Sequence, residues 1–543
     1  MKLVVTGSRP GTRPRDRDVS DTGRVTPPRL VTALLALSLL AAACGGDDPE
    51  AAPTTTATPS VSISSTPSAS VTATPTASPT ATAPAPVEKL TAWKACDGDG
   101  FQCSTLKVPL DAADASKGTV TLALTRKRAS RPADRIGSLV INPGGPGSSA
   151  VGYLQAAWTA IPAPVRARFD LVAFDPRGVG RTAPVRCAST AELDRYYHLD
   201  PTPDTDAELE AYVDGNAKLT SGCQQRSGRV LPYVSTREAA DDLDRVRAAL
   251  GDDTLTYLGY SYGTAIGATY LERYPTKVRA MVLDGALDPR LTWDKLLEGQ
   301  SKGFDLALGA FMADCERTSC PWRDEVDGDL LEEFDALAAR IDRKAIAGVG
   351  SRTVGPGEFS LGAGYGLYSK NLWPTLASAL VQAHRGRGAE ILAMSDRYLD
   401  RTGQGYENVL EANVAVNCID RPWPSGTADY LALADRVRED APRFGPAIAL
   451  SGLVCAPWPI AEVMEPRAVT GKGAPPVVVI GTTRDPATPY EWSVALAEQL
   501  DKGVLIINEG DGHTVYRAGA KACIRERVDA YLLTAKAPSP ARC

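Results

Sequence analysis

The sequence predicts an α/β fold: a mostly parallel sheet with helices on both faces and a helical cap insertion. Two observations favour this class. Short apolar or β-branched runs alternate with amphipathic helical segments before residue 287 and again after residue 471. Between residues 288 and 470 helical segments continue, but strand-like runs are scarce. Ligands bind such sheets beyond the carboxyl ends of the strands, so candidate site residues are sought there.

The individual elements follow from the same patterns. The expected strands are short apolar or β-branched runs, at residues 104–108, 119–125, 136–142, 169–174, 254–258, 277–283, 476–481 and 504–508. The expected helices carry apolar residues at helical spacing, at residues 237–250, from 264 onwards, and at 306–313, 330–341, 376–384, 389–398, 430–437, 492–500 and 522–533. The polar, cysteine-bearing stretch before residue 237 is expected to be a loop.

The N-terminal segment predicts export. Several arginines precede an apolar run at residues 30–43, which is too short to span a bilayer and ends in Ala-Ala-Ala-Cys44. Residues 1–44 are therefore interpreted as a signal peptide with a lipobox-like end. Acylation of Cys44 would anchor the protein to a membrane; the alternative is an ordinary cleaved signal. Residues 45–88 are rich in Thr, Ser, Ala and Pro, a composition typical of a disordered linker.

The rest of the chain divides into three segments. Residues 89–287 are expected to form the first part of the α/β core, residues 288–470 the helical cap, and residues 471–543 the C-terminal part of the core. The formal charge of -6 and the lack of a long Lys/Arg run argue against a nucleic-acid-binding protein.

Cysteine usage agrees with export. Without Cys44, ten of the eleven cysteines remain, and they form pairs of neighbours along the sequence. This spacing suggests five disulfides, although spacing alone does not fix their connectivity. A zinc site is disfavoured because the chain has three histidines and no C-x-x-C pair, so no metal or other cofactor is expected. The suggested pairs are 96 with 103, 187 with 223, 315 with 320, 418 with 455, and 523 with 543.

Residues 254–270 contain the most informative motif, TLTYLGYSYGTAIGATY. A β-branched run leads into Gly259-Tyr-Ser261-Tyr-Gly263, and small residues at helical spacing follow. This order of strand, sharp turn and helix is that of a nucleophile elbow, in which the serine occupies a strained turn between flanking glycines. A G-x-S-x-G pattern alone is weak, but the strand before it and the helix after it make Ser261 a candidate nucleophile.

A second loop nearly lacks side chains. The strand at 136–142 runs into Pro143-Gly-Gly-Pro-Gly-Ser-Ser149, which would bring backbone N–H groups close to a ligand. Gly145 N–H and Tyr262 N–H are the predicted oxyanion-hole donors. Asp175 and Arg177 follow the next strand and are interpreted as a structural ion pair that holds the loop beside the site; the alternative is a catalytic role.

A nucleophilic serine needs a histidine base and a carboxylate that orients it. His198 and His384 lie in polar or basic segments, whereas His513 lies in a Gly-rich loop directly after a strand. Asp485 follows the preceding strand, and Asp284 is the alternative acid, after the strand that follows the elbow. The order Ser261, Asp485, His513 is the nucleophile, acid, base order of α/β-hydrolases, so these residues form the predicted triad.

Five motifs together resemble a known family. PGGPG, FDPRGVGRT, GYSYGT, GTTRDPATPY and GDGHT are similar to those of the secreted tripeptidyl aminopeptidases of actinobacterial type, relatives of proline iminopeptidases. The resemblance covers residues 101–543. It implies an α/β-hydrolase fold and a serine exopeptidase that releases short peptides from free N-termini, with a helical cap over the site. Asn142-Pro143 replaces the usual start of the proline iminopeptidase loop, which argues against single-proline specificity.

An exopeptidase must bind the α-ammonium group of its peptide substrate. Candidate carboxylates in the cap are Glu411, Asp420 and Glu407; the alternative is that they are ordinary solvated acids. Two other functions remain open: a carboxylesterase or lipase, which shares the acyl-transfer chemistry, and a catalytically silent surface-binding lipoprotein. An intact Ser, Asp, His set argues against the silent protein.

Overall fold

The computed structural model describes residues 89–543. The predicted signal peptide, the lipidation site Cys44 and the predicted linker 45–88 lie outside the described residues. Among the helices of residues 89–543, none has both the length and the hydropathy of a bilayer-spanning segment. The same residues contain no cluster of three or more His, Cys, Asp or Glu side chains that is placed to hold a metal ion.

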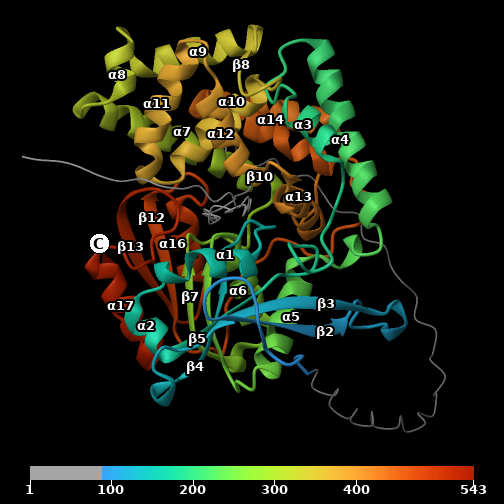
Figure 1. Ribbon diagram of the computed structural model, residues 1–543, viewed down its shortest axis with the longest axis vertical. Helices are drawn as coiled ribbons and strands as arrows, with labels where there is room; N and C mark the ends of the chain where they lie inside the picture. Colours follow the sequence, from blue (N-terminus) through green and yellow to red (C-terminus); the bar gives the residue numbers. More distant parts are fainter. Residues whose placement is uncertain (1–88) are drawn as a thin grey trace, which may run out of the picture. The chain divides into compact units, whose positions relative to one another are not determined.

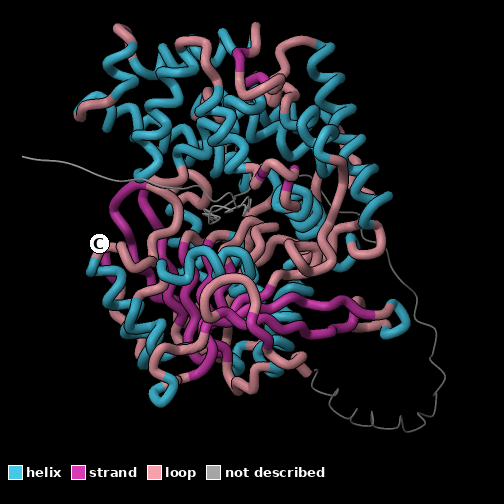
Figure 2. The backbone as a smooth tube through the Cα atoms, viewed as in Figure 1, coloured by secondary structure: helices cyan, strands magenta, loops and turns pink. Residues whose placement is uncertain are grey.

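A ten-stranded sheet forms the centre of the core, with neighbouring strands in the order β1-β2-β3-β5-β4-β6-β7-β12-β13-β14 (Figures 1 and 2). The pairs from β1 to β5 are antiparallel, and every pair from β5–β4 to β13–β14 is parallel. The strands are β1 (Lys94–Ala95), β2 (Phe101–Pro109), β3 (Thr119–Lys127), β4 (Gly137–Asn142), β5 (Phe169–Phe174), β6 (Leu255–Tyr260), β7 (Val278–Asp284), β12 (Val477–Arg484), β13 (Gly503–Asp511) and β14 (Ala541–Arg542). The predicted fold class is confirmed.

Helices cover both faces of the sheet because the strand side chains alternate between two apolar clusters. In β12, Val477 and Val479 belong to one cluster, whereas Val478 and Ile480 belong to the other. The first cluster includes side chains of α5 (Thr236–Ala249), α6 (Tyr262–Arg273) and α16 (Tyr490–Gln499). The second includes side chains of α1 (Ala150–Ala157), α2 (Ala163–Arg168) and α17 (Ala522–Thr534).

The segment between β7 and β12 is mainly helical and lies beyond the carboxyl ends of the parallel strands (Figure 1). Two short hairpins, β8–β9 (Ile346–Ala347 and Thr353–Val354) and β10–β11 (Arg401–Thr402 and Gly405–Tyr406), interrupt it. Its helices are α7 (Trp293–Arg317), α8 (Pro321–Glu325), α9 (Leu330–Arg343), α10 (Pro356–Leu367), α11 (Trp373–His384), α12 (Ala389–Tyr398), α13 (Val409–Asp420), α14 (Thr427–Asp440) and α15 (Gly445–Ser451), with the 3-10 turns η6 (Lys370–Leu372) and η7 (Gly452–Cys455).

One expectation about the stretch between β5 and α5 is wrong. The stretch before α5 contains two helices, α3 (Thr190–Tyr197) and α4 (Asp206–Ser227), where the sequence pattern had indicated a loop. Helix α4 packs against η7 of the cap, and the Thr220 hydroxyl donates a hydrogen bond of 3.0 Å to the Val454 carbonyl. The two helices therefore extend the cap, although they precede the elbow in the sequence.

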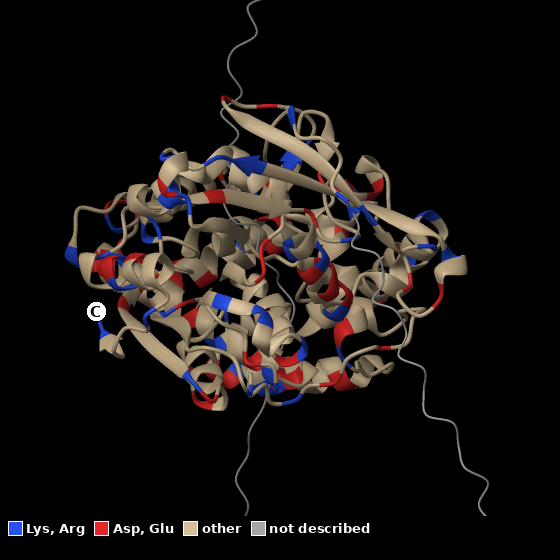
Figure 3. Ribbon diagram, turned by 90° about the horizontal axis from the view of Figure 1, so that it is seen from below, with Lys and Arg blue, Asp and Glu red and all other residues tan. Residues whose placement is uncertain are grey.

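All five predicted disulfides are present, which confirms the sequence-local pairing. The bond between Cys187 and Cys223 joins α4 to the loop after β5, and the bond between Cys418 and Cys455 joins α13 to η7. Charged residues of both signs are interspersed over the view in Figure 3.

Candidate active site

Ser261 occupies the sharp turn between β6 and α6. It is one of few non-glycine residues with a positive φ, 53°, and its backbone N–H donates to the Asp284 carbonyl at 2.9 Å. The flanking glycines are required by close packing. A Cβ on Gly259 would lie 2.5 Å from the Gly263 carbonyl oxygen, and one on Gly263 would lie 2.7 Å from that of Asn142 in β4. The strained backbone and the glycines have the geometry of a nucleophile elbow.

The loop after β4 packs directly against this elbow. A Cβ on Gly144 would lie 2.9 Å from the Ser261 Cβ and 2.9 Å from the Tyr262 backbone nitrogen. Gly144, Gly145 and Gly147 all have positive φ angles, and the Gly144 N–H donates to the Asn142 side chain at 2.9 Å. This packing places the backbone of the glycine loop directly against Ser261 and Tyr262.

His513 and Asp485 meet in the interior. Nδ1 of His513 lies 2.7 Å from Oδ1 and 2.8 Å from Oδ2 of Asp485, and both side chains are fully buried. Asp485 directly follows the last residue of β12, and His513 lies just beyond the last residue of β13. Both strands belong to the parallel part of the sheet. Within the described chain, Nε2 of His513 is buried without a hydrogen-bond partner. An imidazole held through Nδ1 with a free Nε2 is prepared to exchange a proton there.

Thr488 belongs to the same group, and the sequence reasoning missed it. Its backbone N–H donates to Oδ1 of Asp485 at 2.9 Å, and its hydroxyl donates to Oδ2 at 3.1 Å. The hydroxyl also lies 3.2 Å from Nδ1 of His513. The sequence Asp485-Pro-Ala-Thr488 could have indicated this contact, because Asp and Thr side chains often form hydrogen bonds with nearby residues in turns.

Asp284, the alternative acid, has a different position. Its Oδ2 accepts hydrogen bonds from the backbone N–H groups of Val515 (2.8 Å) and Tyr516 (2.7 Å), whereas its buried Oδ1 has no partner among residues 89–543. It therefore holds the backbone just after His513, and Asp485 is the carboxylate on the imidazole. Burial raises the pKa of Asp284 to about 6, although both backbone donors and His513 favour the charged form.

This raised pKa predicts a pH-dependent stability. The folded protein holds the Asp284 proton more tightly than the unfolded chain, so the stabilisation is complete below about pH 4 and is lost as the pH rises through about 6. A pKa raised from 3.8 to about 6 corresponds to about 3 kcal/mol. Urea unfolding should therefore show that the stability of Asp284→Asn relative to the wild type is higher at pH 7.5 than at pH 4, by up to about 3 kcal/mol. The exposed control Asp435→Asn should show no such difference between the two pH values. An equal response of both variants would contradict the prediction.

Two cap segments contact the site. The Tyr368 carbonyl accepts a hydrogen bond of 2.8 Å from the His513 backbone N–H, and the Tyr368 ring lies edge-on to the imidazole with centroids 5.8 Å apart. On the other side, the Asn413 side chain donates to the Pro146 carbonyl at 3.1 Å. The cap thus fixes both the histidine loop and the glycine loop.

Comparison with known proteins identifies the family. Residues 137–321 match the α/β hydrolase fold family, and residues 441–543 match the family described as TAP-like protein. The chain is 41% identical over 465 residues to serine protease Hip1 of Mycobacterium tuberculosis (strain ATCC 25618 / H37Rv), which covers 82% of this chain and 87% of that protein. The chain belongs to the TAP-like α/β-hydrolases.

Two further relatives have different names. Tripeptidyl aminopeptidase of Streptomyces lividans is 32% identical over 467 residues, covering 82% of this chain and 84% of that protein. Carboxylesterase B of Mycobacterium tuberculosis (strain ATCC 25618 / H37Rv) is 36% identical over 447 residues, covering 80% of this chain and 85% of that protein. The predicted resemblance to the tripeptidyl aminopeptidase family is confirmed.

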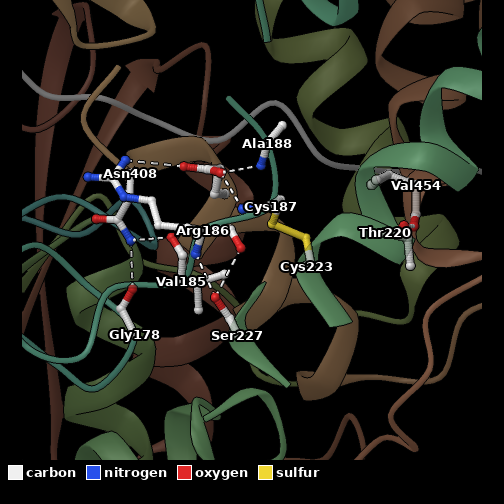
Figure 4. Close-up of a disulfide and its surroundings, with 11 residues drawn as sticks. Gly178, Val185, Arg186, Cys187, Ala188, Thr220, Cys223, Ser227, Asn408 and Val454 are labelled. Carbon is white, nitrogen blue, oxygen red and sulfur yellow. Dashed lines mark hydrogen bonds and ion pairs between the residues drawn. A yellow bond between two sulfur atoms is a disulfide. The ribbon is translucent and has the colours of Figure 1, made fainter. Parts of the chain in front are cut away.

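The three candidate amine-binding carboxylates of this hydrolase lie in different surroundings. Glu411 is buried, and it accepts hydrogen bonds from the backbone N–H groups of Cys187 and Ala188 and from the Arg186 side chain. Figure 4 shows Arg186 and Ala188 beside the disulfide of Cys187 and Cys223. Glu407 is exposed beside the β10–β11 hairpin. The Glu411 carboxylate therefore joins α13 to the loop of Cys187.

Asp420 lies nearer the elbow. Its carboxylate accepts hydrogen bonds from the backbone N–H (2.9 Å) and the hydroxyl (2.5 Å) of Thr236, and that hydroxyl is 2.6 Å from the Tyr262 phenol oxygen. Asp420 and Tyr262 line one cavity. Burial raises the pKa of Asp420 to about 6. Of the three candidates, Asp420 is the one connected to the residue after Ser261.

The predicted pair of Asp175 and Arg177 is wrong. Arg177 instead forms a buried ion pair with Asp242 of α5, at 2.7 Å between Nε and Oδ2. Asp175 accepts hydrogen bonds from the Ser149 hydroxyl and from the backbone of Val151 at the start of α1. Sequence proximity suggested the pair, but the turn directs the two side chains to different helices.

Proposed function

We propose that this protein is an exported serine exopeptidase that releases short peptides from free N-termini through an acyl-enzyme intermediate. The observation that carries the proposal is the buried pair of Asp485 and His513, whose Nε2 is free, beside the strained elbow of Ser261. Relatives named serine protease and tripeptidyl aminopeptidase support peptides as the substrate class.

The proposed reaction has two halves, acylation and deacylation, and each catalytic group acts once in each half. Ser261 Oγ attacks the scissile carbonyl carbon while Nε2 of His513 takes its proton, and Asp485 keeps the imidazole oriented. The N–H groups of Gly145 and Tyr262 stabilise the tetrahedral oxyanion. Collapse breaks the C–N bond, and the leaving amine takes the proton from His513. Water then attacks the acyl-enzyme by the same route and releases the acyl peptide.

Recognition of a free N-terminus is assigned to the cavity beside Tyr262. Asp288, Asp420 and Glu465 line it together with Arg421. Asp288 is already paired with Arg290, so two uncompensated carboxylates, those of Asp420 and Glu465, stand against one guanidinium. This excess of negative charge favours an ammonium group. Asp420 is the proposed amine ligand because it is the carboxylate connected to Tyr262 through Thr236.

Export is proposed on two grounds. The N-terminal sequence has the order of a signal peptide ending at Cys44. Five disulfides within residues 89–543 fit a protein that folds in an oxidising compartment. Acylation of Cys44 would place the enzyme on the outer face of the cell membrane.

Esterase activity is the second candidate because one relative is named carboxylesterase B. A tripeptidyl coumarin amide with a free amine, its N-acetylated twin and a short-chain nitrophenyl ester separate the two functions. The exopeptidase proposal predicts that acetylation lowers kcat/KM by about 100-fold, since it removes a charge that the cavity pairs. Ester hydrolysis without amide hydrolysis would overturn the peptidase proposal and favour the esterase.

A further inference from the structure

The cavity beside Tyr262 contains polar groups that the catalytic proposal does not use. Its volume is about 90 Å³, and its lining includes Pro146 of the glycine loop and Tyr262 at the start of α6. Gln300 of α7 and Arg421, which follows α13, complete the lining. Figure 1 shows α7 and α13 in the helical cap. A group bound here therefore contacts Tyr262, one predicted oxyanion donor, and Pro146, which follows the other, Gly145.

Arg421 is a partly buried cation whose Nε and Nη1 atoms lack a hydrogen-bonding partner among the residues that the structure describes. Its Nε and Nη1 atoms are buried and make no hydrogen bond, and the guanidinium forms no ion pair with any residue between 89 and 543. Burial lowers the pKa of Arg421 to about 10, while the nearby Asp420 carboxylate opposes this shift, so the side chain remains charged at neutral pH. Buried donors without acceptors are costly, which indicates that a ligand supplies an acceptor oxygen.

Gln300 lacks a hydrogen-bond donor within residues 89–543, whereas Arg421 lacks an acceptor there. The residue is 3% exposed, and its Nε2 donates to the Ala487 carbonyl at 2.7 Å, which fixes the orientation of the amide because only the nitrogen can donate. Its Oε1 is buried and has no partner in the described part of the chain. The cavity thus lacks an acceptor for Arg421 and a donor for Gln300.

We propose that Arg421 and Gln300 form a subsite for a main-chain peptide unit of the substrate. The carbonyl oxygen of that unit accepts from the Arg421 guanidinium, and its N–H donates to Gln300 Oε1. A peptide unit supplies both groups without net charge, whereas a carboxylate would meet the Asp420 and Glu465 carboxylates of the lining and leave Gln300 unpaired. This subsite rests on the proposed exopeptidase function and gives it a means of distinguishing peptides from short esters.

The first test compares substrates on full-length variants. Arg421→Gln should lower kcat/KM for the free-amine tripeptidyl coumarin amide by about 10- to 100-fold, since a hydrogen bond to a charged group is lost. Hydrolysis of nitrophenyl acetate, which has no peptide unit, should change by less than about twofold. The matched control is Arg317→Gln, at the far end of the helix that carries Gln300, about 25 Å away along its axis. An equal loss on both substrates, or no loss on the peptide, would overturn the subsite.

The second test removes the donor from the substrate. Depsipeptides in which an ester oxygen replaces the N–H of one peptide unit before the scissile bond, one position at a time, should identify a position that loses about 10-fold in wild type. Gln300→Leu should be insensitive to that replacement, and insensitivity of the wild type at every position would overturn the proposal. If wild type cleaves no free-amine peptide, the proposed function fails, and the subsite with it. If wild type cleaves peptides and Arg421→Gln cleaves them equally well, only the subsite fails.

Discussion

Replacing Ser261 by alanine is expected to lower kcat on a tripeptidyl coumarin amide by about 10⁴- to 10⁶-fold. The hydroxyl oxygen is the atom that forms the acyl bond, and no other group of the elbow can replace it. Labelling by a fluorophosphonate should disappear in the same variant. The oxyanion donors and the binding cavity remain, so weak residual catalysis above the uncatalysed rate is also expected.

The fold should survive this substitution. An alanine in place of Ser261 would keep the positive φ of the turn, and the close contacts of Gly259 and Gly263 do not involve the serine hydroxyl. The unfolding temperature should therefore stay within a few degrees of wild type or rise, as is common when a strained catalytic residue is removed. Ser378→Ala, which removes a hydroxyl on α11 that donates to Glu390, is the control for activity. If wild type resists labelling while folded, the silent binding protein becomes the better interpretation.

Local patterns predicted the parts of the site that depend on neighbouring residues in the sequence. The elbow needs glycines two residues before and after Ser261, and the contacts of Gly259 and Gly263 show the steric reason. The same holds for the glycine loop and for the disulfides, whose partners are close in the chain. The order of strands then placed Asp485 and His513 at one edge of the sheet, where the structure joins them.

Features that depend on distant contacts were not predictable in this way. Arg177 pairs with Asp242, 65 residues away, and no local pattern distinguishes that partner from Asp175. Gln300 and Arg421 are far apart in the sequence and line one cavity only once the cap has folded. The helices α3 and α4 are different, because each begins with a Ser or Thr followed three residues later by Glu, a capping box that the sequence already contained.

Asp485→Asn is expected to lower kcat by about 10⁴-fold while leaving the fold intact. An amide at this position would direct an N–H toward Nδ1 of His513, which favours the tautomer with its proton on Nε2 and so removes the acceptor for the Ser261 proton. The measurement is kcat/KM and kcat on the tripeptide substrate, together with the pH profile of both.

Asp284→Asn is the matched comparison, because Asp284 is also a buried acid at a strand end near His513. Its contacts go to the backbone of Val515 and Tyr516, and an asparagine oxygen can accept both, so kcat should fall by no more than about 10-fold. The reverse ranking of the two variants would contradict the assignment of Asp485 and move the acid to the strand after the elbow. A large loss in both would mean that the position of the histidine loop limits the rate as strongly as the orientation of its imidazole.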